Sequence, residues 1–433
     1  MRVRAAPAAN LARVIRPSAR PRWRARTIEL AEPPQLANHF RSDGTAWLRD
    51  GQGMVGIGEV ARFTGVDFAQ AESRWQDFAA SVQCETELGD HPGSGPVAFG
   101  SFVFDPGHTT EESVVVVPRM VLGHRRGRSW LTVLHPEGAP LPKLPAQLPP
   151  PTAPAGAEVV GKSLSRTDWQ DAVAAAVRRI ETNGLEKVVL ARGEDVQTTD
   201  PLSPRWLVTE LTRRYPSCWT FHVAGLLGAS PEMLLRREGG LALSRVLAGT
   251  IRRGGTEELD LKLAHALARD GKNLIEHELA VASVAGALAP FCSGMNVPDA
   301  PYVLELPNVL HLASDITGVA APGVSALKLA AELHPTAAVC GTPTGPARAA
   351  IAELENLDRG RYSGPVGWLD TRGDGEFAIA LRSGRLHPDD PRTITIYAGC
   401  GIVAGSDPTE EYAETEAKLL PMREALGTPV GRG

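Results

Sequence analysis

A lysine stands inside a strongly apolar segment of the chain. The run Leu185–Arg192 is rich in β-branched residues and lies between two glycines, so it is predicted to form a strand. Strand alternation places Lys187 on one face with Leu185 and Val189. Burial lowers the pKa of a lysine and can make it a general base. A lysine at a strand end whose ammonium group reaches water explains this segment equally well.

A carboxylate follows a run of small residues that ends in proline. In Gly228–Glu232, Pro231 restricts the backbone just before Glu232, which is expected to stand in a loop at the entry to a strand over Met233–Arg237. A carboxylate held there could take part in chemistry. A turn with a solvated carboxylate is the more common outcome of such a sequence, so this motif does not decide the matter alone.

Two predicted helices offer oxygen ligands on one face. Asn273 and Glu276 are three residues apart in one helix, and Glu411 and Glu414 share a face with Lys418 in the last helix. Mg²⁺ prefers oxygen ligands, needs few carboxylates and keeps several waters, so the two faces together could hold it. For either helix alone, a solvated acidic face is the better interpretation.

Two further segments could hold an anionic ligand. Arg382 is predicted to share a strand face with Ala378 and Ala380, whose small side chains would leave room beside the guanidinium for a carboxylate. A structural salt bridge is the competing interpretation. The Gly-Cys-Gly run that begins at Gly399 lacks the spacing of a dinucleotide motif, but its bare backbone would let amides approach an anion.

The elements that must position these residues are short and mixed. Predicted helices and strands do not alternate as a doubly wound sheet requires, which favours an α+β fold with antiparallel sheets. Eight prolines between Pro136 and Pro154 predict an extended connector. We therefore expect a basic disordered tail at 1–26, an N-terminal part of the fold at 27–157 that ends in this connector, and a catalytic part at 158–433.

The helices are predicted at 69–82, 167–182, 257–268, 273–289, 324–333, 347–357 and 409–420. The second helix opens with a Thr167–Gln170 capping box. The main strands are predicted at 45–49, 97–104, 113–118, 185–192, 233–237, 376–383 and 392–397.

Composition excludes several classes of function. Residues 1–26 hold eight arginines and no acidic residue, so the rest of the 433-residue chain carries 37 basic and 50 acidic residues. Such an acidic body argues against a nucleic-acid partner. The sequence lacks a run of about 18 apolar residues, which argues against a membrane span. Five scattered cysteines predict reduced thiols and a cytoplasmic protein.

The order of these segments resembles the chorismate-utilising enzymes, the family that includes isochorismate synthase, salicylate synthase and the large chains of anthranilate and aminodeoxychorismate synthases. The resemblance covers roughly residues 160–425 and implies a large α+β fold in which packed antiparallel sheets are surrounded by helices. The segments that carry it are Lys187–Arg192, Gly228–Glu232, Leu247–Thr250, Glu276–Leu279, His311-Leu312, His334–Thr336, Gly364–Trp368, Ala398–Val403 and Glu411–Lys418.

The resemblance also implies a role for each candidate residue. Lys187 would be the base that activates water, and Glu232 the acid that protonates a departing hydroxyl. Magnesium would bind Glu276 and Glu414 directly and Glu411 through water. The substrate carboxylates would be held by Arg382, Lys418 and the backbone of Gly399, and Thr250 and His311 would line the same pocket. This chain departs from the family at Asn273, where an acidic residue is common.

The implied reaction is conversion of chorismate to isochorismate by a single chain with Mg²⁺. Members that use ammonia usually carry glutamine at the position of Lys187, and the aminodeoxychorismate branch carries lysine at the position of Ala248, so both residues favour water. No glutaminase subunit and a monomer are expected. Salicylate synthase is the alternative, and a non-catalytic relative or a glutaminase-dependent subunit is a third. Trp47–Gly51 and Val97–Phe102 resemble the menaquinone branch of actinobacterial type more than the siderophore branch.

Overall fold

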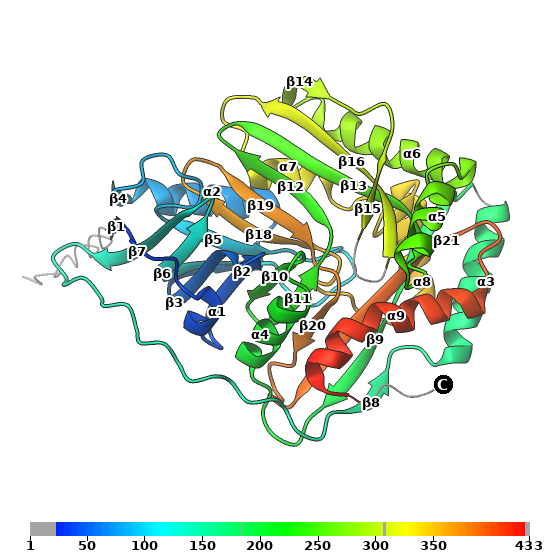
Figure 1. Cartoon of the computed structure of the whole chain (residues 1–433), viewed down its shortest axis with the longest axis horizontal. Coiled ribbons are helices and arrows are strands. Elements are labelled where there is room, and N and C mark those ends of the chain that lie inside the picture. The colour runs from blue at the N-terminus through cyan, green and yellow to red at the C-terminus, as the bar shows by residue number, and fades with distance from the viewer. Residues whose placement is uncertain (1–22, 183, 306–308, 429–433) are drawn as a thin grey trace, which may run out of the picture.

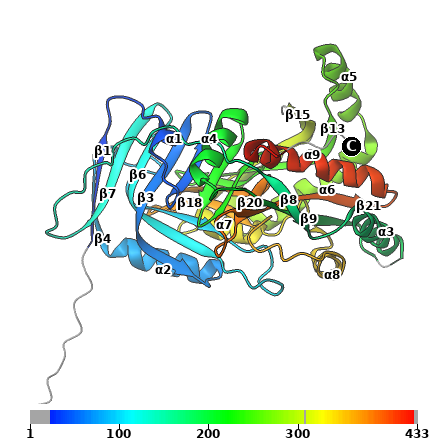
Figure 2. The same ribbon diagram turned by 90° about the horizontal axis from the view of Figure 1, so that it is seen from below.

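Strands that are almost all antiparallel form the centre of the fold, which a computed structural model describes for residues 23–182, 184–305 and 309–428 (Figure 1). Among the strand pairings of these residues, one is parallel, between β1 (Trp23–Glu29) and β4 (Val82–Thr86), and the others are antiparallel. Helices lie around the strands (Figure 2). The predicted α+β class is therefore correct, and a doubly wound parallel sheet is excluded.

The sheet divides into two branches at β6 (Val114–Arg125). The first half of β6 pairs with β5 (Val97–Ser101), the second half pairs with β7 (Arg128–Pro136), and β3 (Gln52–Thr64) pairs along the other edge. The first branch continues from β3 through β2 (Thr45–Arg49), β10 (Trp219–Val223), β11 (Leu226–Ser230), β20 (Ser383–Leu386), β21 (Thr393–Val403) and β9 (Lys187–Gln197), with β8 (Glu158–Lys162) and β17 (Gly341–Thr342) on the outer edge of β9. The second continues from β5 through β18 (Pro365–Asp370), β19 (Gly375–Ile379), β12 (Met233–Glu238), β13 (Leu241–Arg252) and β16 (Val309–Ala320), with β14 (Cys292–Asn296) and β15 (Tyr302–Glu305) beside β16.

Large apolar side chains fill the space between the branches. Trp47 and Phe221 from the first branch pack in one buried cluster with Phe99, Met233 and Trp368 from the second. Burial of this much apolar surface is the main force that holds two sheet faces together. The N-terminal strands therefore belong to the same fold as the C-terminal ones, although the proline-rich connector separates them in the sequence.

Helices cover the outer faces of both branches. On the second branch, α7 contacts β12 and β19, and α6 contacts β13 and β16 (Figure 1). On the first branch, α3 and α9 contact β21, and α8 contacts β9. The helices are α1 (Leu36–His39), α2 (Phe68–Ala80), α3 (Arg166–Thr182), α4 (Pro204–Arg214), α5 (Glu257–Leu267), α6 (Gly271–Leu288), α7 (Ala326–Leu333), α8 (Thr344–Leu354) and α9 (Pro408–Leu426). Among the described helices, none is long and apolar enough to cross a membrane.

Several predicted boundaries differ from the structure. Strand β1 begins at Trp23, inside the predicted 1–26 tail, because Trp23–Arg26 pair with β4 and β7; residues 1–22 lie outside the described part. The box that caps α3 is Ser165 with Asp168, two residues earlier than the predicted Thr167–Gln170. Helix α9 continues past Leu420 because its last turn buries Met422 and Leu426 against β11 and β21.

A buried ion-pair network fixes α9 on strand β9. The Arg192 guanidinium, fully buried on β9, pairs with Glu194 at 2.8 Å and with Glu416 on α9, and its Nε donates to Thr415 at 2.8 Å. Arg423, also on α9, pairs with Glu194 at 2.5 Å. The helix that carries three of the predicted site residues is therefore anchored by charge-assisted hydrogen bonds.

We predict that Arg192→Ala lowers the free energy of unfolding by about 3 kcal/mol, because it removes a buried guanidinium from Glu194, Glu416 and Thr415 and leaves Arg423 as the remaining close partner of the two carboxylates. Urea denaturation measures this change. The matched control is Arg213→Ala, since Arg213 also pairs with a glutamate but its side chain is 65% exposed; its expected effect is below about 0.5 kcal/mol. Equal losses in the two variants would contradict the assigned anchoring role.

Candidate active site

The chain crosses between the two sheet branches twice at the same place. The first crossing joins β11 to β12 through Pro231 and Glu232, and the second joins β19 to β20 through Ala380–Arg382. The two crossings are bonded to each other. Ser230 Oγ donates to the Ile379 carbonyl at 2.6 Å, the Ile379 amide donates to the Glu232 carbonyl at 3.1 Å, and the Ala229 amide donates to the Arg382 carbonyl at 3.2 Å.

Arg382 lies in the second crossing and not in a strand, as the sequence had predicted. The strand predicted over 376–383 ends at Ile379, and Arg382 adopts a left-handed backbone with φ of 48°. Ala378 and Ala380 point into the buried cluster between the branches, so they do not share a face with Arg382. Non-glycine residues rarely adopt this backbone, and such positions gather at functional sites.

The loop predicted before Glu232 is shorter in the structure than in the prediction. Gly228–Ser230 belong to β11, and the bend is confined to Pro231 and Glu232. Gly228 is required for close approach, because a Cβ there would lie 2.7 Å from the Arg382 carbonyl oxygen. The small residues of this motif therefore bring the two crossings together.

Glu232 is surrounded by positive charge but is shielded from water. Burial raises the pKa of its carboxyl group to about 7, although Arg382, Lys187 and Lys418 act in the opposite direction. The three cations come from three different parts of the chain, so the fold has brought together residues that the sequence predicted separately. A carboxyl group with this pKa is partly protonated near neutral pH and can donate a proton.

Lys187 is the first residue of β9 and lines the same cavity as Glu232. Its side chain lies over Gly401, where a Cβ would come within 2.8 Å of the lysine Cε. On the other edge of β9, Lys187 stands opposite Thr342 of β17. Leu185 precedes the strand, which begins two residues later than predicted. The lysine is nevertheless directed to a cavity, which favours the functional interpretation of this segment.

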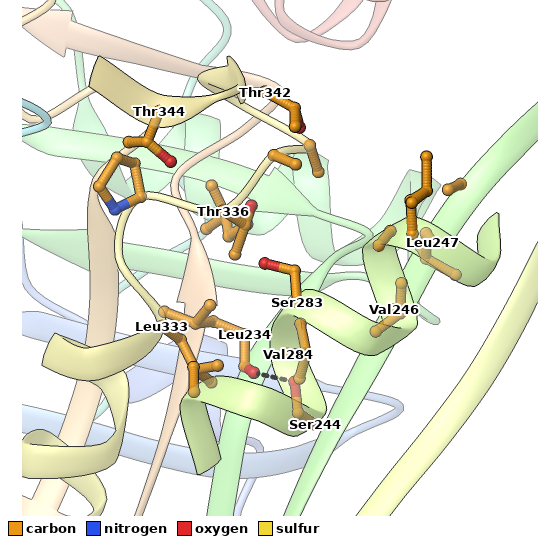
Figure 3. A pocket seen from close by; sticks show the side chains of 18 of the residues that line it. Leu234, Ser244, Val246, Leu247, Ser283, Val284, Leu333, Thr336, Thr342 and Thr344 are labelled. Carbon is orange, nitrogen blue, oxygen red and sulfur yellow. Dashed lines mark hydrogen bonds between the residues drawn. The ribbon is translucent and has the colours of Figure 1, made fainter. Parts of the chain in front are cut away.

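The cavity has a volume of about 540 Å³. Besides Lys187 and Glu232, its lining includes Ala280 and Ser283 of α6, whose small side chains leave space for the cavity. Figure 3 shows the hydroxyl groups of Thr336, Thr342, Thr344 and Ser283 around this space. The sequence did not predict a site role for the three threonines. Their segment comes beside Lys187 only through the antiparallel pairing of β17 with β9.

The predicted carboxylate-binding residues lie close together. Lys418 Nζ donates to the Gly399 carbonyl at 2.9 Å and pairs with Glu414 at 2.6 Å. Thr250 and His311 stand opposite each other on β13 and β16, and their side chains are 2.8 Å apart (Oγ1 to Nδ1). Burial, Arg382 and Lys418 lower the pKa of His311 to about 4, so its ring is neutral at physiological pH.

The predicted metal ligands are described in part. Glu276 lies on α6, but its side chain lies outside the described residues. Burial and the charge of Glu414 raise the pKa of Glu411, whereas Lys418 outweighs burial and lowers the pKa of Glu414. Two carboxylates on one helix face that act on each other suit a hard cation. Within the described residues, no three His, Cys, Asp or Glu side chains form a ready-made metal site.

Asn273 lies at the edge of this acidic face. A Cβ on Gly249 would come within 3.2 Å of both Asn273 Cβ and Oδ1, so the asparagine side chain rests against the bulge that precedes Thr250. An uncharged side chain therefore occupies the place one helical turn before Glu276.

Comparison with known proteins identifies relatives along most of the chain. The model of a family described as chorismate binding enzyme matches residues 35–427. Isochorismate synthase MenF of Bacillus subtilis is 32% identical over 404 residues, covering 86% of this chain and 85% of that protein. Putative isochorismate synthase MenF of Mycobacterium tuberculosis is 36% identical over 349 residues, covering 77% and 87%. The salicylate biosynthesis isochorismate synthase of Pseudomonas aeruginosa is 35% identical over 387 residues, covering 83% and 79%.

Solved structures agree with the described fold. The menaquinone-specific isochorismate synthase MenF from Escherichia coli aligns with a TM-score of 0.79 at 25% identity and covers 94% of this chain and 95% of its own. Anthranilate synthase component I from Streptococcus pneumoniae aligns with a TM-score of 0.64 at 21% identity, covering 97% and 95%, which supports the shared fold.

The pKa of Glu232 predicts a pH-dependent stability. Because the folded-state pKa of about 7 exceeds the ordinary value of 4.5, the stabilising contribution of the protonated group is full below pH 4.5 and is lost as the pH rises through 7. Relative to Glu232→Gln, the wild-type protein should therefore become less stable between pH 5 and 8. Thermal unfolding of both proteins across this range measures the difference, and parallel curves would contradict the raised pKa.

Proposed function

Because the chain belongs to the family of chorismate binding enzymes, we propose that it is an isochorismate synthase that uses water as nucleophile and Mg²⁺ as cofactor. The observation that carries the proposal is that Lys187 and a partly protonated Glu232 line one cavity. A base and an acid facing one space is the arrangement that an addition with loss of a hydroxyl requires.

The reaction moves a hydroxyl group between two ring carbons. Lys187, as the general base, takes a proton from water as the water oxygen bonds to C2 of chorismate. The ring double bonds shift, the C4–oxygen bond breaks, and protonated Glu232 gives its proton to the departing hydroxyl, which leaves as water. Atoms balance, since one water enters and one leaves, and the charges of Lys187 and Glu232 are reset when a proton passes back through solvent.

Charge complementarity explains how a dianionic substrate is held. Chorismate carries two carboxylates, and Arg382 and Lys418 supply positive charge beside Glu232 and His311. Neutral His311 and Thr250 can donate or accept hydrogen bonds without adding charge. Glu414 and Glu411, with Glu276, would hold Mg²⁺, which would neutralise a substrate carboxylate when bound. In the described structure Lys418 is the cation that compensates Glu414.

The relatives share chorismate as substrate but are named for different pathways. The MenF relatives support a role in menaquinone biosynthesis, whereas a relative named for salicylate biosynthesis and others named for siderophores keep those pathways as alternatives. Nothing in the proposal requires a glutaminase, since the relatives named above are isochorismate synthases. We propose a single-chain, cytoplasmic enzyme.

We predict that purified protein with chorismate and Mg²⁺ forms isochorismate without stoichiometric pyruvate. Lys187→Ala and Glu232→Gln should each lower kcat by about 10²–10⁴-fold, because each removes one proton-transfer group. For the wild type, kcat/KM should fall as the pH rises above 7, where Glu232 loses its proton. Chromatography and a coupled pyruvate assay identify the products, and the rate of isochorismate formation gives kcat and kcat/KM for each variant and pH.

Surface residues supply the controls for this experiment. Lys328→Ala and Glu258→Gln remove charges in exposed helix pairs and should leave kcat unchanged. Full activity of Lys187→Ala or Glu232→Gln would refute the assigned roles. Pyruvate equal to the chorismate consumed would identify a salicylate-forming enzyme instead.

We predict that a chelator stops the reaction and that added Mg²⁺ restores it. Glu414→Ala should raise the Mg²⁺ concentration required for half-maximal activity by at least about tenfold, since a direct carboxylate ligand is lost. Glu410→Ala provides a matched control on the same helix, because Glu410 is exposed at the first turn. Activity that is indifferent to chelator would contradict the metal proposal.

A further inference from the structure

Within the part of the chain that the structure describes, no strand pairs with one edge of β9 between Val188 and Glu194. Along one edge, β21 pairs with β9 over the whole of Lys187–Gln197. Along the other edge, β17 pairs only with Lys187 and Val188, and β8 pairs only from Glu194 onward. The Val189 amide still donates to the Cys340 carbonyl at 2.9 Å. The Val189 carbonyl and the Ala191 amide lie beyond this bond and face a gap in the sheet, where buried polar groups need other partners.

Two side chains bond to the backbone in this gap. Arg359 Nη2 donates to the Val189 carbonyl at 2.7 Å, and the Ala191 amide donates to Glu355 Oε1 at 2.7 Å. The two side chains form an ion pair with each other at 2.5 Å. One carboxylate and one guanidinium thus supply the acceptor and the donor that a neighbouring strand would have supplied.

The same guanidinium also holds the segment that leads into β17. Arg359 Nη1 donates to the Val339 carbonyl at 2.9 Å. Three residues later Thr342 stands opposite Lys187, and its carbonyl accepts the Glu186 amide at 2.8 Å. Arg359 therefore connects β9 to the segment that leads into β17, the strand that pairs with Lys187 on this edge.

Burial shows that the pair belongs to the interior. Glu355 is 7% exposed and Arg359 is 4% exposed. The Arg359 guanidinium lies 4.3 Å from the ring centre of Phe104, a residue of the N-terminal part of the chain. The recorded hydrogen bonds of the Arg359 guanidinium go to Glu355, Val189 and Val339. Several partners therefore fix its orientation at once.

We propose that Glu355 and Arg359 are positioning residues that hold Lys187 in place for proton transfer. The proposal rests on the proposed function, in which Lys187 is the base. Lys187 begins β9, where a strand end would otherwise fray, and a reacting group displaced by about 1 Å can lose about a hundredfold in rate. The pair keeps the backbone on either side of the lysine in register without touching the substrate.

The test compares two carboxylates that make the same kind of contacts in different places. Glu355→Gln removes the carboxylate charge that pairs with Arg359 and accepts the Ala191 amide. The control Asp374→Asn removes a carboxylate that is 3% exposed and that also accepts one guanidinium, from Arg237, and one backbone amide, from Gly239, at the far hairpin of β12 and β13. Steady-state kinetics, thermal unfolding and hydrogen exchange of peptides covering 185–191 are measured for both.

For Glu355→Gln we expect kcat to fall at least about tenfold with KM for chorismate within twofold, and faster exchange in the 185–191 peptides. Asp374→Asn should lose a similar amount of thermal stability and keep kcat and the exchange of these peptides within twofold. Unchanged kcat in Glu355→Gln, or an equal loss of kcat in Asp374→Asn, would overturn the proposal.

A second variant keeps the test decisive if a lone buried charge prevents folding. Glu355→Met with Arg359→Met replaces the pair by apolar side chains, a change that often preserves stability. It leaves the Val189, Ala191 and Val339 backbone groups without these partners, so kcat should remain low; full recovery of kcat would show that the pair is merely structural. If the wild type makes no isochorismate, the proposed function fails, and the exchange measurement still reports whether the pair orders the segment around Lys187.

Discussion

Three hydrogen bonds between two chain crossings determine the form of the site. The bonds from Ser230 to Ile379, from Ile379 to Glu232 and from Ala229 to Arg382 connect the two places where the chain passes from one sheet branch to the other. Regular pairing stops at such a crossing, so side chains there can turn away from both sheet faces. The acid and the guanidinium therefore lie together because the chain crosses twice between the two branches at this place.

The electrostatics of the site follow from that arrangement. A carboxyl group at the crossing is removed from water, and burial outweighs the attraction of Arg382, Lys187 and Lys418 in setting its pKa. If Glu232 were more exposed, the same cations would keep it ionised and it could not donate a proton near neutral pH. Arg382 and Lys418 are thus free to hold the carboxylates of the substrate while a fraction of Glu232 stays protonated near neutral pH.

The N-terminal part of the chain contributes support rather than chemistry. It carries no predicted catalytic residue, yet β2 pairs with β10 and β5 pairs with β18, so it joins the two branches behind the site. Phe104 from this part covers the guanidinium of Arg359, and Trp47 donates to buried Glu376 of β19 at 2.9 Å. These contacts explain why a family match begins near residue 35 and not at the connector.

The sequence by itself determined the fold class, the family and the identity of the candidate residues, because strand alternation, helix spacing and ordered motifs are local properties of a chain. It could place Glu411, Glu414 and Lys418 on one face of α9, since a helix repeats every few residues. It failed at Arg382, at the loop before Glu232 and at Thr342, where the backbone conformation is imposed by a strand distant in the sequence. Only the tertiary structure decided that the pKa of Glu232 rises to about 7 and that a buried ion pair bonds to the open edge of β9 at Val189 and Ala191. Burial and edge pairing depend on segments that local sequence does not bring together.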